Sequence, residues 1–555
     1  MWLGELEEEP IEPFHRLESW NPAKVTALEG FIRDLKLTTP ETLRNAGKET
    51  ASIDVPGAFE IIELLAQNKH FHEMPFYRIL PTGGIELCEL WSKAVYSLEN
   101  ILRRTWWRRI WTAQEAFLPD RAVIQVGPHS TPYAKFVDAV SSWDFHIWST
   151  CCLSILDLWM GYSSNELRPA IQRVKELNVL QEVRAYSQSA SVAHPRSASV
   201  AHSLFQLSIH RSSMLRHDHV YGLFGLITEF FQLDTEPDYS LSLARLYATT
   251  TIKFMENAKH LCLLPYARPQ RPQRLQHILD KQEQELLREL PSWTPDWGTD
   301  PWGDYFDIYN YGGFTADKML SYDGAHQCDT ILKLEGFAVG TIPVIGRLIN
   351  DMMVPPGKFV PIIQEWIDLA KGKDLPPRAV WEIIHVATHK DVGLEKVGLQ
   401  EAWWELLKGL ADNDATFQEM QDAATVKQLQ FCVASMEWLD KRAVFVVEPY
   451  STLSDRTANS DEISEYRSTF PHGSIGLALP NIREGDFIFI VKGGRTPFVF
   501  RPLSDALLRS KAMEEGIPEE DLSKCFTLVG VCYIYGMMQG QALAENPRWE
   551  QIYIL

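Results

Sequence analysis

The chain has 555 residues, of which 45% are hydrophobic and 23% are charged, and its formal net charge is −20. This composition is ordinary for a globular protein and excludes disorder over most of the chain. The excess of acidic residues excludes a general attraction to nucleic acid or anionic lipid, so we expect neither as a partner and leave only a local basic patch open.

The spacing of the cysteines indicates whether the chain binds a metal, and its apolar segments indicate its location in the cell. The eight cysteines contain no CxxC pair, which disfavours a zinc site or a redox motif. The acidic start of the chain lacks both the basic and the apolar region of a secretion signal. The longest uncharged run, Cys525–Ala544, is interrupted by glycines and glutamines, so we expect no membrane-spanning helix. We therefore expect a cytoplasmic protein that holds no metal.

The segment Trp91–Leu118 shows helical spacing. Apolar residues from Trp91 to Leu102 recur at i, i+4, i+7 and i+11, which predicts a helix with one apolar stripe. The stripe loses its phase at Arg103–Trp107, so we expect a joint there and a second helix that Pro119 ends. Ala122–Val126 then predicts a short strand, closed by Gly127 and Pro128.

The middle of the chain is mostly helical in pattern. Helical spacing runs from about Ser149 to Gln188 and resumes from Leu204 to Leu226. Between them the sequence SASVAH occurs twice, at 189–194 and 197–202, which we interpret as a solvated loop insertion that proteases should cut first. A further helix is expected at Leu241–Met255, with Ser240 as its N-cap.

After Asp300 the pattern changes to short β-rich runs. They predict strands at Ile331–Ala338, Val444–Val447, Phe487–Val491, Phe498–Phe500 and Phe526–Tyr535. A helical block, Pro361–Leu439, interrupts them, and the polar segment Ser451–Glu465 is expected to be a mobile loop. The C-terminal part, residues 306–555, is therefore expected to be an α+β domain with a small β-sheet or barrel.

Common catalytic motifs are missing from the sequence: there is no GxxxxGK[ST] loop, no HExxH and no GxSxG. The densest candidate for a site is Arg103–Glu115. On a helix, Trp111 and Glu115 share one face, and Arg108 precedes Trp111 by one turn. Such a group can hold ribose hydroxyls or stabilise an oxocarbenium-like centre. The alternative is a structural one, an Arg–Glu ion pair beside a core tryptophan.

Short blocks rich in Trp, Gly and Pro are spread over the chain. They are WLG at Trp2–Gly4, RIWTAQE at Arg109–Glu115, DHVYGLFGL at Asp218–Leu226, PDYS at Pro237–Ser240, PSWTPDW at Pro291–Trp297, GSIGL at Gly473–Leu477, GD at Gly485–Asp486, PFVFR at Pro497–Arg501 and LVGVCYIYG at Leu528–Gly536. In these blocks and their order the chain resembles the fungal heterokaryon incompatibility family, the HET-domain proteins.

The resemblance implies a fold class and a site. HET domains are similar to TIR domains, which are doubly wound α/β folds, and some TIR domains cleave NAD with a Glu four residues after a Trp. By this resemblance, Glu115 would be the catalytic carboxylate, and Trp111 and Arg108 would bind NAD as the substrate, with no cofactor. The implied fold is mixed α/β and α+β, with a partial TIR-like doubly wound layer in residues 1–145 as the C-terminal portion of a HET domain, a helical middle in 146–305, and the α+β domain.

The family's S-Y-x-W-G and W-I-D-x-x-C-I-N-Q segments are not found in the sequence. We therefore expect the chain to lack the N-terminal half of the HET domain, and with it much of the nucleotide cleft. Two functions stay open, and a third possibility is a truncated, inactive gene product or an incomplete gene model. The first is non-self recognition, in which contact with other incompatibility proteins leads to growth arrest or death of fused cells. The second is a TIR-like NAD glycohydrolase, inactive in the present form.

Overall fold

A computed structural model describes the chain over residues 54–148, 174–180, 197–267, 289–298, 315–348, 356–384, 442–449 and 473–555, with short gaps inside these ranges. The chain divides into two compact units. The first comprises Met1–Arg196 and His202–Pro237, and the second comprises Ser197–Ala201 and Asp238–Leu555. The division into residues 1–145, 146–305 and 306–555 stays a prediction.

The first unit is mainly helical. Its described elements are α3 (Val55–Ala66), β1 (Tyr77–Ile79), β2 (Ile85–Leu87), α4 (Glu89–Arg103), the 3-10 helix η3 (Thr105–Arg108), α5 (Thr112–Phe117), β3 (Val123–Val126), β4 (His129–Pro132), α6 (Tyr133–Trp148), α10 (Asp218–Tyr221) and α11 (Phe224–Phe231). Helix α9 (Ser197–Ile209) begins in the second unit and ends in the first.

The joint predicted at Arg103–Trp107 is confirmed. Helix α4 ends at Arg103, and η3 follows it before α5 begins. Trp107 anchors the joint, because its buried ring stacks on Phe136 of α6 at a centroid distance of 5.3 Å. Its indole Nε1 also donates a hydrogen bond of 2.8 Å to the carbonyl oxygen of Ile101. Burial of so large a ring fixes where the helical phase changes.

The described strands of the first unit form two antiparallel pairs, β1 with β2 and β3 with β4. A doubly wound layer needs parallel strands joined by long crossovers. Gly127 and Pro128 alone separate β3 from β4, and Gly127 has a φ of 55°, so this connection permits antiparallel pairing only. The described part of the unit therefore contains hairpins in place of the predicted parallel layer, while residues 1–53 lie outside it. The mixed α/β class itself is confirmed.

Two local predictions are wrong. The second SASVAH copy opens helix α9, because Val200, Ala201 and Leu204 are buried on one helical face. The first copy, and the Ser451–Glu465 segment, lie outside the described residues. Helix α12 (Leu243–Ala258) is capped by Ser242, whose Oγ accepts from the Arg245 amide at 3.3 Å. The predicted cap, Ser240, instead donates through its amide to Asp238 Oδ1 at 2.9 Å in a preceding turn.

The second unit carries most of the strands. Its remaining described elements are the 3-10 helix η4 (Leu264–Tyr266), β5 (His326–Cys328), β6 (Ile331–Ile345), α16 (Pro356–Lys371), α17 (Arg378–Ile384), β7 (Ala443–Pro449), β8 (Ser474–Ala478), β9 (Phe487–Val491), β10 (Phe498–Pro502), α21 (Ala506–Glu514), η8 (Glu519–Lys524), β11 (Cys525–Ile534), η9 (Gln541–Leu543) and β12 (Glu550–Ile554). All five strands predicted in this region are present.

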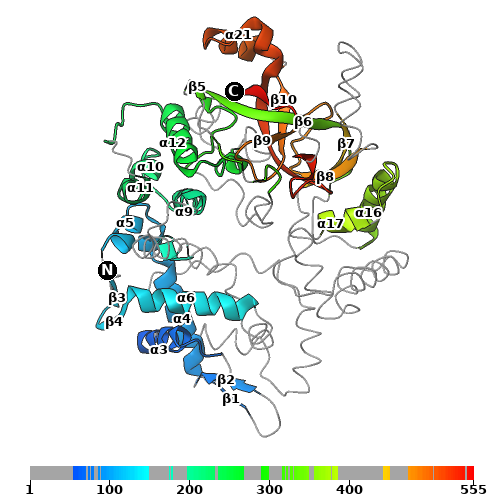
Figure 1. Cartoon of the computed structure of the whole chain (residues 1–555). Helices are drawn as coiled ribbons and strands as arrows, with labels where there is room; N and C mark the ends of the chain where they lie inside the picture. The colour runs from blue at the N-terminus through cyan, green and yellow to red at the C-terminus, as the bar shows by residue number, and fades with distance from the viewer. Residues whose placement is uncertain are drawn as a thin grey trace. The chain divides into compact units, whose positions relative to one another are not determined.

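The strands close into a β-barrel (Figure 1). The antiparallel pairings β10–β9, β9–β6, β6–β7, β7–β8, β8–β11 and β11–β10 form a complete ring. Strand β12 pairs parallel with β11 and antiparallel with β6. Strand β6 takes part in several pairings because it is 15 residues long and changes register between Ala338 and Gly340. Bulges of this kind let a sheet bend far enough to close, and the predicted C-terminal sheet or barrel is confirmed.

Apolar side chains fill the barrel. Its buried cluster includes Phe337, Phe445, Ile488, Val499 and Cys532, which come from five different strands. Gly340 permits the tight approach of β6 to β7, because a Cβ atom there would lie 2.1 Å from the carbonyl oxygen of Glu448. Among the helices that the structure describes, none combines the length and the apolar character needed to traverse a lipid bilayer.

Candidate functional site

The three residues predicted to form a site lie on the surface of the first unit. Arg108 is the last residue of η3, Trp111 is the N-cap of α5, and Glu115 belongs to the first turn of α5. Arg108 and Glu115 are exposed, and Trp111 is 39% exposed. Glu115 Oε2 accepts a hydrogen bond of 3.1 Å from the indole Nε1 of Trp106.

This geometry differs from both interpretations of the segment. The ion pairs of the described residues do not include one between Glu115 and Arg108 or Arg109, and the core tryptophan is Trp107 rather than Trp111. A catalytic carboxylate that stabilises a cationic centre works best where water is excluded. Because Glu115 is exposed, the described geometry supplies no such enclosure, and the roles of Glu115, Trp111 and Arg108 stay predictions.

The backbone around this segment is fixed by a partner segment far away in the sequence. Arg109 and Ser212 form a parallel β-bridge. The Ile110 amide donates to the carbonyl oxygen of Ser212 at 3.0 Å, and the Ser212 amide donates to that of Arg108 at 2.5 Å. The two segments therefore run side by side in the same direction, one just before α5 and the other before α10.

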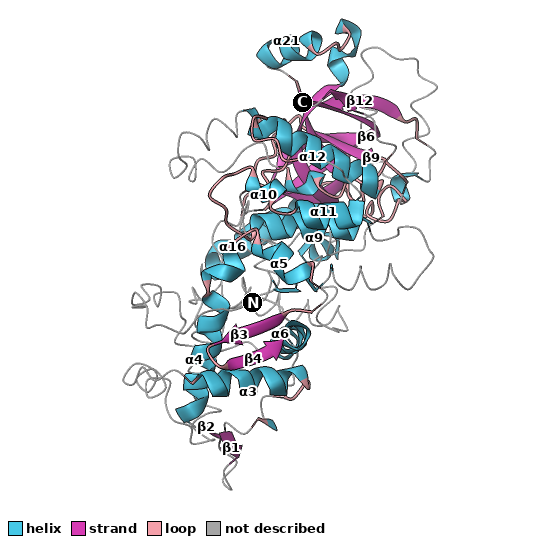
Figure 2. Cartoon of the chain, turned by 90° about the vertical axis from the view of Figure 1, so that its left-hand side faces the viewer, coloured by secondary structure: helices cyan, strands magenta, loops and turns pink. Residues whose placement is uncertain are grey.

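Side chains lock the two helical segments together beyond this bridge. Gln114 Nε2 donates a 2.7 Å hydrogen bond to the carbonyl oxygen of Gly222. A Cβ atom on Gly222 would lie 2.9 Å from Ile110 Cγ2, and one on Gly225 would lie 2.4 Å from Gln114 Oε1. Figure 2 shows α5 beside α10 and α11. The RIWTAQE and DHVYGLFGL blocks are thus the two halves of one packed platform, which spacing in either block alone did not reveal.

The PSWTPDW block has a structural role in the second unit. Ser292 Oγ accepts from the Leu528 amide at 2.9 Å and donates to the carbonyl oxygen of Leu555. Trp293 Nε1 donates to the carbonyl oxygen of Thr330 at 3.3 Å, and Trp297 Nε1 donates to Thr251 Oγ1 at 3.1 Å. The block therefore ties α12 to strands β11 and β12 of the barrel.

The GD and PFVFR blocks also meet in space. Arg501 donates from Nε to Asp486 Oδ1 at 2.8 Å and from Nη2 to Asp486 Oδ2 at 2.9 Å. The same guanidinium donates to the carbonyl oxygen of Asn481, and Asp486 Oδ2 also accepts from the Arg483 amide at 2.7 Å. The Asp486 side chain is only 2% exposed. These hydrogen bonds hold the start of β9 against the end of β10, which assigns Asp486 a structural role.

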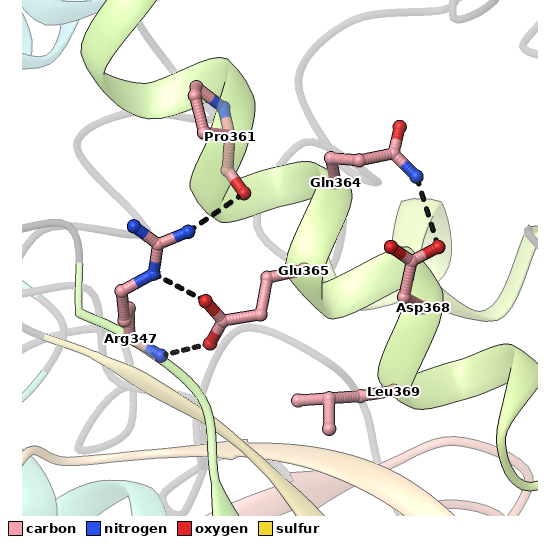
Figure 3. Close-up of a pocket in the computed structure, with 6 residues that line it drawn as sticks. All are labelled: Arg347, Pro361, Gln364, Glu365, Asp368 and Leu369. Carbon is pink, nitrogen blue, oxygen red and sulfur yellow. Dashed lines mark hydrogen bonds and ion pairs between the residues drawn. The ribbon is translucent and has the colours of Figure 1, made fainter.

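A shallow pocket lies between α16 and the segment after β6 (Figure 3). Arg347 pairs with Glu365 and donates to the carbonyl oxygen of Pro361 at 3.1 Å, and Gln364 donates to Asp368 at 3.1 Å. The side chains of Arg347 and Asp368 are 59% and 62% exposed. Because its polar groups bind each other and face water, the pocket offers little to a ligand. Groups of His, Cys, Asp and Glu suited to a metal ion are absent from the described residues.

The described molecule is a mixed α/β protein of two compact units, one of which contains a closed β-barrel. Its sequence is similar to that of heterokaryon incompatibility protein 6, OR allele, from Neurospora crassa. The identity is 22% over 501 residues, which cover 83% of this chain and 68% of that protein. This similarity confirms the resemblance to heterokaryon incompatibility proteins. No family model matches the chain, and no solved structure matches it.

Proposed function

We propose that this protein acts in fungal non-self recognition and promotes growth arrest or programmed cell death after unlike cells fuse. The observation that carries the proposal is the similarity to a heterokaryon incompatibility protein along 83% of the chain. The protein acts in the cytoplasm, and its partners are other incompatibility proteins.

The packing of the blocks supports this proposal. RIWTAQE contacts DHVYGLFGL through Gln114 and Gly222, and GD contacts PFVFR through Asp486 and Arg501. Both units are therefore built on residues that carry the resemblance. A surface-exposed functional segment on a rigid platform suits a protein that acts by contact with another protein.

The test uses two fungal strains that differ only in this gene. Fusion of the strains is expected to give poor heterokaryon growth and dying fusion cells, and induced expression in a host lacking the gene is expected to slow growth. Gly222→Val, which places a side chain against Ile110, should abolish both effects, whereas the exposed Phe145→Ala change should leave them intact. Normal growth at verified protein levels, with free heterokaryon formation, would falsify the proposal.

NAD cleavage is the alternative function, with Glu115 as the catalytic carboxylate and Trp111 and Arg108 as substrate-binding residues. Its support is the spacing of four residues between Trp111, the N-cap of α5, and Glu115 in the first turn of that helix. Glu115 is exposed, so the described structure has no specific feature that favours NAD cleavage. Incubation of the purified chain with NAD, with nicotinamide release as the readout, separates the two functions.

A further inference from the structure

Two adjacent segments of the first unit expose large apolar and basic side chains together. Trp111 is 39% exposed, Met214 is 98% exposed and Leu215 is 52% exposed. Arg108 and Arg109 are also exposed. We call these five residues the Trp111 surface. Exposed tryptophan and methionine are uncommon on surfaces that face only water.

The backbone of the Trp111 surface is held in place. The Arg109–Ser212 bridge aligns its two segments, and the Gln114–Gly222 hydrogen bond holds the helices that follow them. Beyond the bridge, Ser213 Oγ donates to the carbonyl oxygen of Leu215 at 2.6 Å, which closes a tight turn under Met214. A preorganised backbone lowers the entropic cost of ordering this surface when a partner binds.

The side-chain chemistry favours an acidic occupant. Among the described ion pairs and side-chain hydrogen bonds, none involves the guanidinium of Arg108 or Arg109, although the chain as a whole carries a net charge of −20. The nearby carboxylate of Glu115 already accepts from Trp106. Guanidinium groups pair with carboxylates in a two-point geometry, and Trp, Met and Arg are enriched at protein interfaces.

We propose that the Trp111 surface binds an acidic segment of a partner protein that presents large apolar side chains between its carboxylates. The arginines pair with the carboxylates, and Trp111, Met214 and Leu215 bury the apolar anchors. The net charge of −20 disfavours a nucleic acid, which would bring a long row of phosphates against an acidic molecule. This inference rests on the proposed function for the identity of the partner, but the binding itself is measured independently of growth.

The test measures binding of the purified full chain to a fluorescein-labelled peptide in which Glu alternates with Leu and Phe. Wild-type protein is expected to bind this peptide and to bind poorly to two others, one with Lys for Glu and one with Ser for the apolar residues. Trp111→Ala and the double change Arg108→Ala with Arg109→Ala should each weaken binding about tenfold or more. The exposed Arg121→Ala and Phe145→Ala variants are matched controls that should bind like wild type.

Three results would overturn the inference. The first is equal binding of the acidic peptide by wild type and both surface variants. The second is tighter binding of a single-stranded oligonucleotide than of the acidic peptide. The third is self-association in sedimentation that Trp111→Ala abolishes, which would make a second copy of the chain the occupant. Circular dichroism and thermal melting verify that each variant is folded. Failure of the peptide to bind counts against this inference alone, whereas normal growth on expression of the wild-type chain counts against the proposed function alone.

Discussion

Two carboxylates of this protein, Glu115 and Asp486, have very different surroundings. Glu115 is exposed and accepts one hydrogen bond from Trp106. Asp486 is buried, and its two oxygens accept three hydrogen bonds. The two carboxylates should therefore respond very differently to substitution.

We expect Glu115→Ala to lower the free energy of unfolding by about 1 kcal/mol or less, because exposed polar contacts compete with water. We also expect purified wild-type chain to leave NAD intact, since nothing described shields this carboxylate from solvent. Chemical denaturation and nicotinamide release measure the two effects. Turnover of NAD that disappears in the Glu115→Ala variant would promote the enzyme hypothesis instead.

Asp486→Asn should destabilise the protein by about 3 kcal/mol, because it removes the charge that partners the largely buried guanidinium of Arg501. Glu448→Gln is the matched control in the same unit: its partner Lys373 lies 2.9 Å away, but the Glu448 side chain is 41% exposed. The control should lose less than about 1 kcal/mol. Equal losses in urea denaturation of the two variants would contradict the structural role given to Asp486.

At the scale of elements, helices α5, α10 and α11 depend on a close approach that glycine permits. A Cβ atom on Gly225 would lie 2.4 Å from Gln114 Oε1 and 3.0 Å from Leu118 Cδ1. The side chain of Gln114 is already committed to Gly222. The position of α5, and with it the Trp111 surface, therefore depends on two glycines in a segment more than one hundred residues away.

Gly225→Ala should destabilise the first unit by about 1–3 kcal/mol, the usual range for overpacking. Gln114→Ala alone should lower stability through loss of its hydrogen bond. The double variant Gly225→Ala with Gln114→Ala should lose less free energy of unfolding than the two single variants lose together, because the clash is absent without the Gln114 side chain. This coupling is measured by a double-mutant cycle in urea. Strict additivity of the two changes would show that Gly225 and Gln114 do not meet.

At the scale of the whole molecule, the turn that follows α12 is hydrogen-bonded to two other segments of the second unit. Lys259 accepts from the Tyr322 amide at 3.0 Å, and the Leu261 amide donates to the carbonyl oxygen of Gly493 at 2.8 Å. His260 lies between these two contacts. Desolvation, and secondarily the charge of Arg495, lower the pKa of His260 to about 3.

The second unit should consequently lose stability as the pH falls. In the unfolded chain His260 titrates near its ordinary pKa of about 6.5. Below that pH the unfolded state therefore binds a proton that the folded state does not bind. The contribution is fully present above pH ~6.5 and is lost progressively toward pH ~3. The loss of unfolding free energy reaches about 2 kcal/mol at pH ~5, since each pKa unit corresponds to about 1.36 kcal/mol.

His260→Gln should flatten the fall in unfolding free energy between pH ~6.5 and pH ~5, as measured by urea denaturation at each pH. His129→Gln, in the β3–β4 hairpin of the other unit, is the matched control. An unchanged slope in the His260→Gln variant would show that another group governs the acid sensitivity.

The sequence by itself determined the features that depend on neighbours along the chain. The phase change at Arg103–Trp107 marked the end of α4, and runs of aromatic and β-branched residues marked β6, β7, β9, β10 and β11. It also placed Trp111 and Glu115 on adjacent turns of one segment. Hydrophobic periodicity and the residues that begin or end a helix act over a few positions, so they can be recognised without knowledge of the fold.

Only the tertiary structure decided pairing and burial. Strands β8, which contains Gly476, and β12 carry weak local signals, and they form because their backbones pair with β7, β11 and β6. Likewise, helical spacing did not show which tryptophan of this segment is buried: Trp107 packs against Phe136 and is fully buried, whereas Trp111 is 39% exposed. Barrel closure pairs residues as far apart in the sequence as Glu335 and Gln551, and the burial of Trp107 depends on Phe136 in a different helix, so no local pattern contains that information.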